Sequence, residues 1–434
     1  MTDLTARLLD LAIAIQQIPA PTFHERQRAE FVHRQFLKEE LSDVEIDATG
    51  NVYARLPGPS TSLPGLAASP SSRKDIGTMW PTGQGAGRAA PFGAAPWPGR
   101  QPVLPQGHRD DVADRPGGRQ GNPLVVSAHL DTVFPENTEL RVFREEGRIS
   151  GPGIGDNAIG VAGLLGLVWA LRERGLPLAG DLWLVADVCE EGLGDLRGMQ
   201  AVVDRFGDGA RAYLVLEGMA LGQVYHRALG VRRYRISIKT AGGHSWADYG
   251  QPSAIHELTS LAAQITSLEL PAEPRTTLNV GKINGGTSVN TIAARATLEL
   301  DLRSESPQIL LGVSRQVEAL ARGMERAGVA VGVEIIGQRL AGEIPAGHPL
   351  VQAAQECLRK QGVQPNLTIG STDANIPLSR GYPAVAIGLT SGSGAHTLHE
   401  YINIKPLEQG MEQLVGLVRR LGEESNQLPV SNRQ

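Results

Sequence analysis

The chain has 434 residues, 41% of them hydrophobic and 20% charged, so it can fold in water around more than one hydrophobic core. The balance of 41 basic and 46 acidic residues gives a net charge of -5 without a basic stripe, which excludes a typical nucleic-acid binder. Two cysteines exclude a disulfide framework, so we expect a reducing, cytoplasmic compartment. The N-terminus carries Asp3, Arg7 and Asp10, unlike a secretory signal, and the longest apolar run, 161–171, is too short to cross a membrane.

A proline-rich segment interrupts the N-terminal part of the chain. Twelve of the 28 prolines lie from Pro57 to Pro123, mixed with glycine, alanine and serine and without apolar periodicity. Such a composition cannot bury enough apolar surface to offset the entropy lost on ordering. We therefore predict a disordered insertion at residues 58–122. A functional lid is the alternative.

Short apolar runs alternate with helical patterns on both sides of this segment. The runs are continuous rather than alternating, which is typical of parallel strands covered on both faces. The predicted strands are 124–128, 182–186, 213–216 and 384–387, and a helix is predicted at 161–174. This order indicates an α/β layer domain with a mainly parallel central sheet.

Residues 230–340 show a different pattern. Apolar and polar residues alternate around 234–238 and 296–302, which predicts strands with one face toward solvent. Helical patterns lie at 255–265 and near 313–327. We predict a smaller, ferredoxin-like α+β module here. The larger domain would then comprise residues 1–229 and 341–425, with a helix at 350–361 and a tail at 426–434.

Potential metal ligands or proton-transfer groups follow each of the four predicted parallel strands. These residues are His129 and Asp131, Glu190 and Glu191, Glu217, and His396. Asp156 lies in a glycine-rich loop just before the helix at 161–174. The carboxyl ends of strands in an open α/β sheet are where ligands bind, and adjacent buried carboxylates repel one another unless a cation balances them. The convergence of these residues therefore indicates a metal site.

Each residue taken alone has a structural interpretation. His129 can belong to a capped turn, and Asp156 can cap a helix. Glu190 and Glu191 can be solvated charges in a loop. Cys189 continues the apolar strand, so we interpret it as a core residue rather than a thiolate ligand.

Five motifs in order resemble the co-catalytic zinc metallopeptidases, the family of peptidase T, carboxypeptidase G, aminoacylase and acetylornithine deacetylase. The motifs are Ser127-Ala-His-Leu-Asp-Thr-Val133, Gly153-Ile-Gly-Asp-Asn157, Glu190-Glu-Gly192, Leu216-Glu-Gly218 and Ala395-His-Thr-Leu-His-Glu-Tyr401. The resemblance covers the chain except for residues 58–122. Gly242-Gly-His-Ser-Trp246 and Pro252-Ser-Ala-Ile255 place it nearest to the peptidase T-like branch.

The resemblance implies a role for each matching residue. His129 and Glu217 would bind one zinc ion, Glu191 and His396 the other, and Asp156 would bridge them. Each ion would then have three protein ligands and a shared water, an open arrangement typical of catalytic zinc.

Two further residues would act beside the ions. The Asp131 carboxylate would accept the second ring N–H of His129, and Glu190 would be the general base. His396 is chosen over His399 because the family's ligand lies four residues before the glutamate of this motif. His399 would lie at the surface or behind the ligands.

The resemblance also implies functional residues in the 230–340 module. His244 would reach into the active site of a partner subunit and donate to the oxyanion of the tetrahedral intermediate. Asn290 and Arg303 would hold the carboxylate or the backbone of the substrate. A surface ion pair with Glu299 or Asp301 is the alternative for Arg303.

The function expected from this reading is hydrolysis of amide bonds in small peptides by a di-zinc exopeptidase, with manganese or cobalt as other possible metals. An aminoacylase or deacetylase acting on N-acyl amino acids is the first alternative. A metal-free binding or scaffold protein is the second. We expect a homodimer formed through residues 230–340, without nucleic-acid or membrane partners. No Gly-x-Ser-x-Gly elbow follows a strand, which argues against a serine hydrolase.

Overall fold

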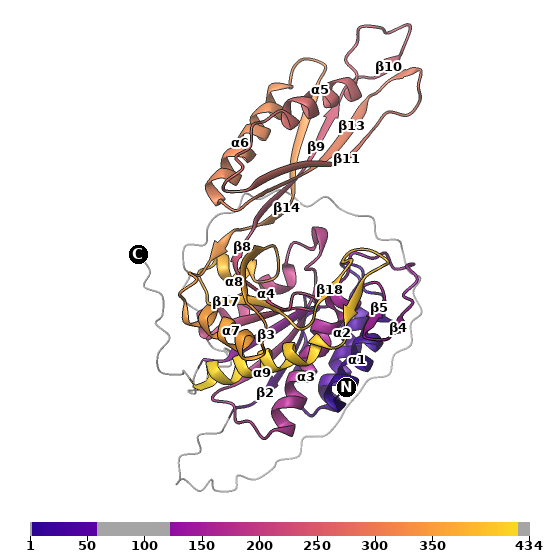
Figure 1. Cartoon of the computed structure of the whole chain (residues 1–434). Helices are drawn as coiled ribbons and strands as arrows, with labels where there is room; N and C mark the ends of the chain where they lie inside the picture. Colours follow the sequence, from indigo (N-terminus) through magenta and orange to yellow (C-terminus); the bar gives the residue numbers. More distant parts are fainter. Residues whose placement is uncertain (1, 59–121, 424–434) are drawn as a thin grey trace, which may run out of the picture. The chain divides into compact units, whose positions relative to one another are not determined.

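A computed structural model of the chain describes residues 2–58 and 122–423 (Figure 1). The predicted insertion at 58–122, apart from its two end residues, and the predicted tail at 426–434 lie outside the described residues. The described residues form a large α/β sheet domain and a second sheet built from residues within 230–340.

The large domain is organised around one sheet, in the order β1-β2-β6-β3-β7-β17-β8-β15, with β16 against β8. Its strands are β1 (Ser42–Ile46), β2 (Val52–Leu56), β3 (Leu124–His129), β6 (Leu182–Asp187), β7 (Ala212–Glu217), β8 (Gln223–Ala228), β15 (Gly342–Glu343), β16 (Asn366–Gly370) and β17 (Ala384–Gly388). The four central strands β6, β3, β7 and β17 are mutually parallel, as predicted. The neighbouring strands β2 and β8 pair with them in antiparallel fashion.

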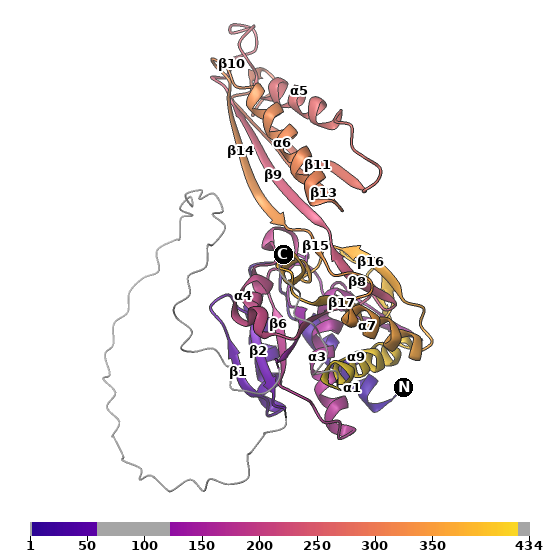
Figure 2. The ribbon, with the colours of Figure 1, turned by 90° about the vertical axis from the view of Figure 1, so that its left-hand side faces the viewer.

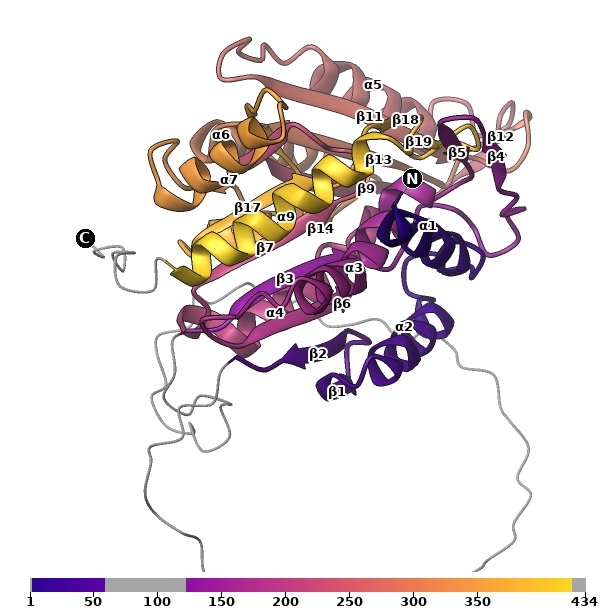
Figure 3. The same cartoon turned by 60° about the horizontal axis from the view of Figure 1, so that its bottom comes forward.

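Burial explains why the central strands read as continuous apolar runs. Every residue of β3, β6 and β17 is buried, because both faces of the sheet are covered. The helices of this domain are α1 (Asp3–Gln16), α2 (Arg26–Lys38), α3 (Ile159–Glu173), α4 (Arg197–Phe206), α7 (Pro349–Lys360), α8 (Asn375–Ser379) and α9 (Pro406–Glu423). Helix α3 contacts β3, β6 and β7, with α1 and α9 packed beside it (Figure 3).

The apolar segment that contains helix α3 is longer than the run at 161–171, which by its length is too short to cross a membrane. A short helical turn at Ile154–Ala158 precedes α3, and together they make a 20-residue apolar segment that by length and composition could span a membrane. In the fold, 94% of its apolar window is buried inside the protein. Gly166 lets α1 pack closely, since a Cβ there would lie 2.5 Å from Cδ2 of Leu8. The segment is therefore the central core helix of the domain.

Two small sheets complete the secondary structure outside the main layers. One has the order β18-β19-β5-β4, formed by β4 (Phe143–Glu145), β5 (Arg148–Ser150), β18 (Gly392–Ser393) and β19 (Tyr401–Asn403). It brings the chain after β17 against the segment before α3. The other pairs β10 (Gly243–His244) with β12 (Thr291–Ile292).

The segment from β9 to β14 forms an antiparallel sheet in the order β11-β13-β9-β14 (Figure 2). We call this segment, residues 230–339, the module. Its main elements are β9 (Gly230–Lys239), α5 (Ala254–Thr266), β11 (Thr276–Gly285), β13 (Arg295–Ser304), α6 (Pro307–Gly323) and β14 (Ala330–Arg339). Burial alternates along β13, and the buried side chains form a core of their own with α5 and α6.

The second helix of the module starts earlier than its apolar pattern suggested. Helix α6 begins at Pro307, behind Ser306, whose side chain accepts a hydrogen bond from the N–H of Ile309. Serine at the cap and proline in the first turn are favoured at a helix start. The cap therefore sets the boundary.

Candidate metal centre

Parallel pairing brings the predicted ligands to one edge of the sheet. His129 and Glu217 are the last residues of β3 and β7, two neighbouring parallel strands. Glu191 follows the end of β6, and His396 lies in the loop after β18. Asp156 belongs to the short helical turn in front of α3. The five residues thus come from five segments whose ends meet at the carboxyl edge.

The five side chains form two groups that share Asp156. One group is His129, Asp156 and Glu217, the other is Asp156, Glu191 and His396, and the ligand atoms within each lie within 4.8 Å of one another. Nε2 of His129 is 3.1 Å from one Asp156 oxygen, and Nε2 of His396 is 3.1 Å from the other. Nε2 of His396 is also 3.1 Å from Oε1 of Glu191. The grouping is the one that the resemblance implies for a bridged pair of ions.

The electrostatics of these groups fit a pair of cations. Hydrogen bonds to Asp156 and Glu191 raise the pKa of His396 to about 10. Burial would lower the pKa of His129, but the adjacent carboxylates of Asp131 and Asp156 hold that pKa well above the usual value. Burial raises the pKa of Glu217 well above the usual value. Protons on the two imidazoles thus occupy positions between nitrogen and carboxylate that a metal ion would take. Two imidazoles with three carboxylates suit zinc, manganese or cobalt.

Glu400 holds the loop that presents Asp156. Its fully buried carboxylate accepts hydrogen bonds from the N–H groups of Gly155 at 2.7 Å, Asp156 at 2.8 Å and Gly153 at 3.1 Å. Burial raises the pKa of Glu400 to about 7. In the sequence, this glutamate served only as the reference point for the histidine four residues before it. Nothing in the sequence around Glu400 indicates that three main-chain N–H groups, 244 to 247 residues away, would donate to its carboxylate.

Asn157 joins two of the ligand-bearing segments and was also missed. Its side-chain amide donates to the carbonyl oxygen of Leu216 at 2.8 Å and accepts from the N–H of Gly218 at 3.0 Å. These two residues flank Glu217, so Asn157 fixes the Asp156 loop against the end of β7.

The structure modifies the expected role of Asp131. Nδ1 of His129 lies 3.1 Å from the main-chain carbonyl oxygen of Asp131 but 3.6 Å from its Oδ1, so the carbonyl is the better acceptor. The carboxylate instead accepts bonds of 2.9 Å from the N–H groups of Glu190 and Glu191 and from the hydroxyl of Thr22. Asp131 therefore orients His129 through its backbone and the two glutamates through its side chain.

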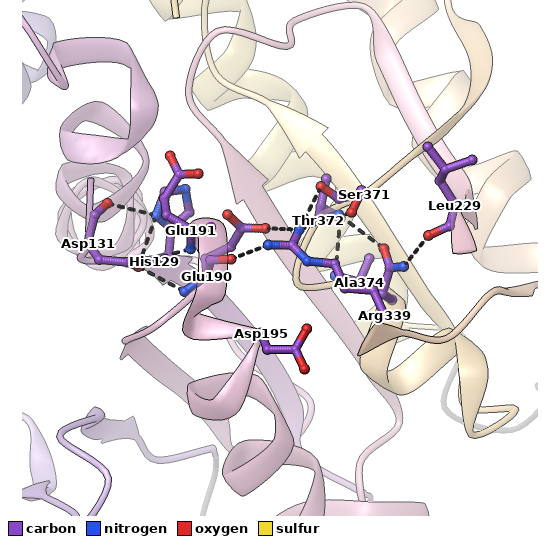
Figure 4. A network of polar contacts seen from close by, with 12 residues as sticks. His129, Asp131, Glu190, Glu191, Asp195, Leu229, Arg339, Ser371, Thr372 and Ala374 are labelled. Carbon is purple, nitrogen blue, oxygen red and sulfur yellow. Dashed lines mark hydrogen bonds and ion pairs between the residues drawn. The ribbon is translucent and has the colours of Figure 1, made fainter. Parts of the chain in front are cut away.

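Glu190 lies next to the candidate ligand Glu191, with its side chain 8% exposed. Its Oε1 accepts a hydrogen bond of 2.8 Å from Nη1 of Arg339, at the end of β14 (Figure 4). Burial raises the pKa of Glu190 to about 7, against the opposing charges of Arg339 and His129. A buried carboxyl group that titrates near neutrality has the proton affinity that a general base needs.

His244 and Asn290 lie together in the module. Strand β10 pairs His244 with Thr291 of β12, and the N–H of Ser245 donates to the carbonyl oxygen of Asn290 at 3.0 Å. Nδ1 of His244 accepts from the N–H groups of Trp246 and Ala247 at 3.2 and 3.3 Å. No contact among the described residues links His244 to the five candidate ligands of its own chain.

Arg303 has the surface ion pair that was its alternative interpretation. Its Nε lies 2.7 Å from Oδ2 of Asp301, and its side chain is 41% exposed. Within the described part of the chain, no hydrogen bond or ion pair connects Arg303 with His244 or Asn290.

His399 and Cys189 lie outside the two ligand groups. His399 is exposed, and its N–H donates to the hydroxyl of Thr397. Cys189 is buried in the core as expected, and burial raises the pKa of its thiol to about 12.

Comparisons with known proteins agree with this architecture. Residues 125–420 match the model of "Peptidase family M20/M25/M40". The uncharacterized protein YqjE of Bacillus subtilis is 23% identical over 95% of this chain and 97% of its own length. Carboxypeptidase G2 of a Pseudomonas species is 25% identical over 72% of this chain and 77% of its own. The crystal structure of a tripeptidase from Staphylococcus aureus has a TM-score of 0.69 at 20% identity, covering 97% of this chain and 99% of that one.

Proposed function

Because the chain belongs to peptidase family M20/M25/M40, and is therefore a hydrolase of amide bonds, we propose that it is a two-metal exopeptidase acting on small peptides. The observation that carries the proposal is the pair of ligand groups sharing Asp156, with the buried Glu190 beside them. Similarity to a carboxypeptidase and a tripeptidase supports a short peptide substrate. We propose zinc as the metal.

In the proposed reaction the ions would activate the water and the substrate carbonyl, and side chains of the protein would transfer the proton. Divalent ions in such a site lower the pKa of a water molecule and polarise the amide carbonyl. Glu190 takes the proton of the attacking water and delivers it to the leaving amine as the C–N bond breaks. Asp131 fixes the main chain of Glu190 and Glu191, so that the base and a ligand keep their relative positions.

In this proposal two chains form a homodimer through the module, and His244 of each chain completes the active site of the other. Its Nδ1 accepts two main-chain N–H bonds, so the proton of the neutral ring is on Nε2. Nε2–H can then donate to the oxyanion of the tetrahedral intermediate. Asn290, beside His244, would bind the backbone of the substrate, and Arg303 would bind its carboxylate in place of Asp301.

Metal analysis and a substrate panel test the proposal. Protein purified without chelator should contain about two divalent ions per chain. It should hydrolyse di- or tripeptides faster than N-acetyl amino acids, whereas the reverse preference would indicate the aminoacylase or deacetylase activity. Fewer than one ion per chain under metal-replete conditions would contradict the metal site and favour a metal-free binding protein.

Glu190→Gln should keep its metal and lose turnover by about a hundredfold or more, because a general base contributes that much. The matched control is Glu136→Gln, an exposed position, which should behave as the wild type. Near-normal turnover in Glu190→Gln would show that Glu190 is not the base. Loss of metal would show that Glu190 and Glu191 have exchanged roles.

A further inference from the structure

The chain passes between the large domain and the module at two points, Leu229 and Leu340, and polar contacts are made at both. Figure 4 shows the contact at Leu229. The side-chain amide of Asn375 donates to the carbonyl oxygens of Leu229 at 2.9 Å and Leu340 at 3.1 Å. The N–H of Leu229 donates to the carbonyl oxygen of Gly370 at 2.6 Å. The ends of β9 and β14 are thus fixed to the large domain beside the candidate metal centre.

Arg339, the last residue of β14, lies within this network and reaches the proposed base. Its side chain is 5% exposed. Nη1 donates to Oε1 of Glu190 at 2.8 Å and to the hydroxyl of Ser371 at 2.9 Å, and Nη2 donates to the main-chain carbonyl of Glu190. The guanidinium therefore binds both the side chain and the backbone of Glu190.

Gln338, the residue before Arg339, binds the other end of the loop that begins at Glu190. The N–H of Gln338 donates to both carboxylate oxygens of Asp195, at 2.8 and 3.0 Å. Two successive residues of β14 thus hold the 190–195 loop at both of its ends. A hold on both the backbone and the carboxylate of Glu190 restricts the rotation of its side chain, which a single contact would not do.

The contact also leaves one carboxylate oxygen available. Arg339 engages Oε1 of Glu190, whereas no hydrogen bond within residues 2–58 and 122–423 engages Oε2. Removing Arg339 would leave a buried carboxylate without its main counter-charge, and the side chain would turn toward other positive groups such as His129.

We propose that Arg339 is the positioning residue of the general base, a fixed guanidinium that directs Oε2 of Glu190 toward the attacking water. The inference rests on the proposed function. It also makes the position of the base depend on β14, so that the module contributes to proton transfer in its own subunit.

The test compares Arg339→Met and Arg339→Lys with a matched control, Arg233→Met. Arg233 also joins the module to this loop, since it donates to the carbonyl oxygen of Gly192, but it pairs with Asp301 and does not touch Glu190. Arg339→Met should lower kcat about a hundredfold, with KM within about threefold and metal content unchanged, because misplacing a reacting group by 1 Å costs that much. Arg339→Lys should recover part of the loss, and Arg233→Met should stay within about threefold of the wild type.

Chemical rescue separates positioning from a structural role. Guanidinium chloride at millimolar concentration should restore kcat in Arg339→Ala but not in Glu190→Gln. A kcat that stays within threefold in Arg339→Met overturns the proposal. So does a kcat loss that comes with equal loss of metal, or that guanidinium does not relieve. If the Met and Ala variants do not fold, Arg339→Lys decides, and a wild-type kcat for it overturns the proposal.

A second measurement does not depend on activity. In metal-free protein, the shifts in Tm caused by Arg339→Met and Glu190→Gln should not add in the double variant, because both remove the same ion pair. Additive shifts overturn the proposal. If the shifts are coupled but the wild type cleaves no amide substrate, the proposed function fails while the contact stands. If the wild type is active and the Arg339 variants match it, only this inference fails.

Discussion

Replacing Glu400 by glutamine should destabilise the metal-free protein and weaken its metal site. Glu400 accepts three main-chain hydrogen bonds from the loop that carries Asp156. In Glu400→Gln one oxygen remains to accept from Gly155 and Asp156, but an NH₂ group then faces the N–H of Gly153. The substitution therefore changes the charge and one donor–acceptor pair while it keeps the size of the side chain.

Two opposing effects set the change in the free energy of unfolding caused by Glu400→Gln. The lost bond and the unsatisfied N–H of Gly153 cost about 3 kcal/mol. Against this, the wild type must bury a carboxyl group whose pKa burial raises from 4.5 to about 7 even with its three hydrogen bonds, a cost of about 1 kcal/mol at pH 5 and about 3 kcal/mol at pH 8. The net loss in the free energy of unfolding is therefore about 2 kcal/mol at pH 5 and falls toward zero at pH 8. Looser support of a ligand should weaken metal affinity about tenfold to a hundredfold.

Urea unfolding at pH 5 after chelator treatment measures the first effect, and competition with a chromophoric chelator measures the second. Glu136→Gln, at an exposed position outside the helices and strands, is the matched control and should change neither quantity. If Glu400→Gln leaves both the urea midpoint and the metal affinity at wild-type values, the three hydrogen bonds do not support the Asp156 loop and the reasoning is wrong.

Three further predictions follow from other parts of the chain. Burial raises the pKa of Asp187 to about 7 and that of its neighbour Asp373 well above the usual value; the folded state therefore retains protons that the unfolded state releases. The free energy of unfolding of the metal-free protein should thus fall as pH rises from about 4 to about 7, and it should fall less steeply with pH in Asp373→Asn. The prediction is wrong if urea unfolding gives the same pH dependence for the variant and the wild type. Deletion of residues 58–122 with a short linker should leave folding and metal binding largely intact, because Leu56 at the end of β2 and Leu124 at the start of β3 both pair with Leu182 of β6; insoluble or metal-free protein would contradict it. Mixing His244→Ala with Glu190→Gln should restore about a quarter of wild-type activity once subunits exchange, since half of the dimers carry one intact site; no recovery after verified exchange would exclude the shared site.

The architecture and the candidate ligands could be predicted before the structure. Continuous apolar runs predicted β3, β6, β7 and β17 as parallel strands, because strands covered on both faces need apolar residues at every position. Residues at the ends of parallel strands must share one edge of the sheet, which is why His129, Glu191 and Glu217 could be expected to lie near one another before any coordinates. The resemblance of five motifs to a known family added the division of the ligands between two ions, with Asp156 shared.

The contacts that support the candidate site became evident from the folded structure alone. Glu400 meets Gly155 across 245 residues, and Arg339 meets Glu190 across 149. The partners of these side chains are largely main-chain N–H and C=O groups, which every residue carries and which therefore leave no pattern in the sequence. The carbonyl of Asp131 replaced its carboxylate as the partner of His129 for the same reason. Apolar periodicity reports which face of an element is buried, whereas the pairing of single polar groups depends on where the folded backbone brings them together.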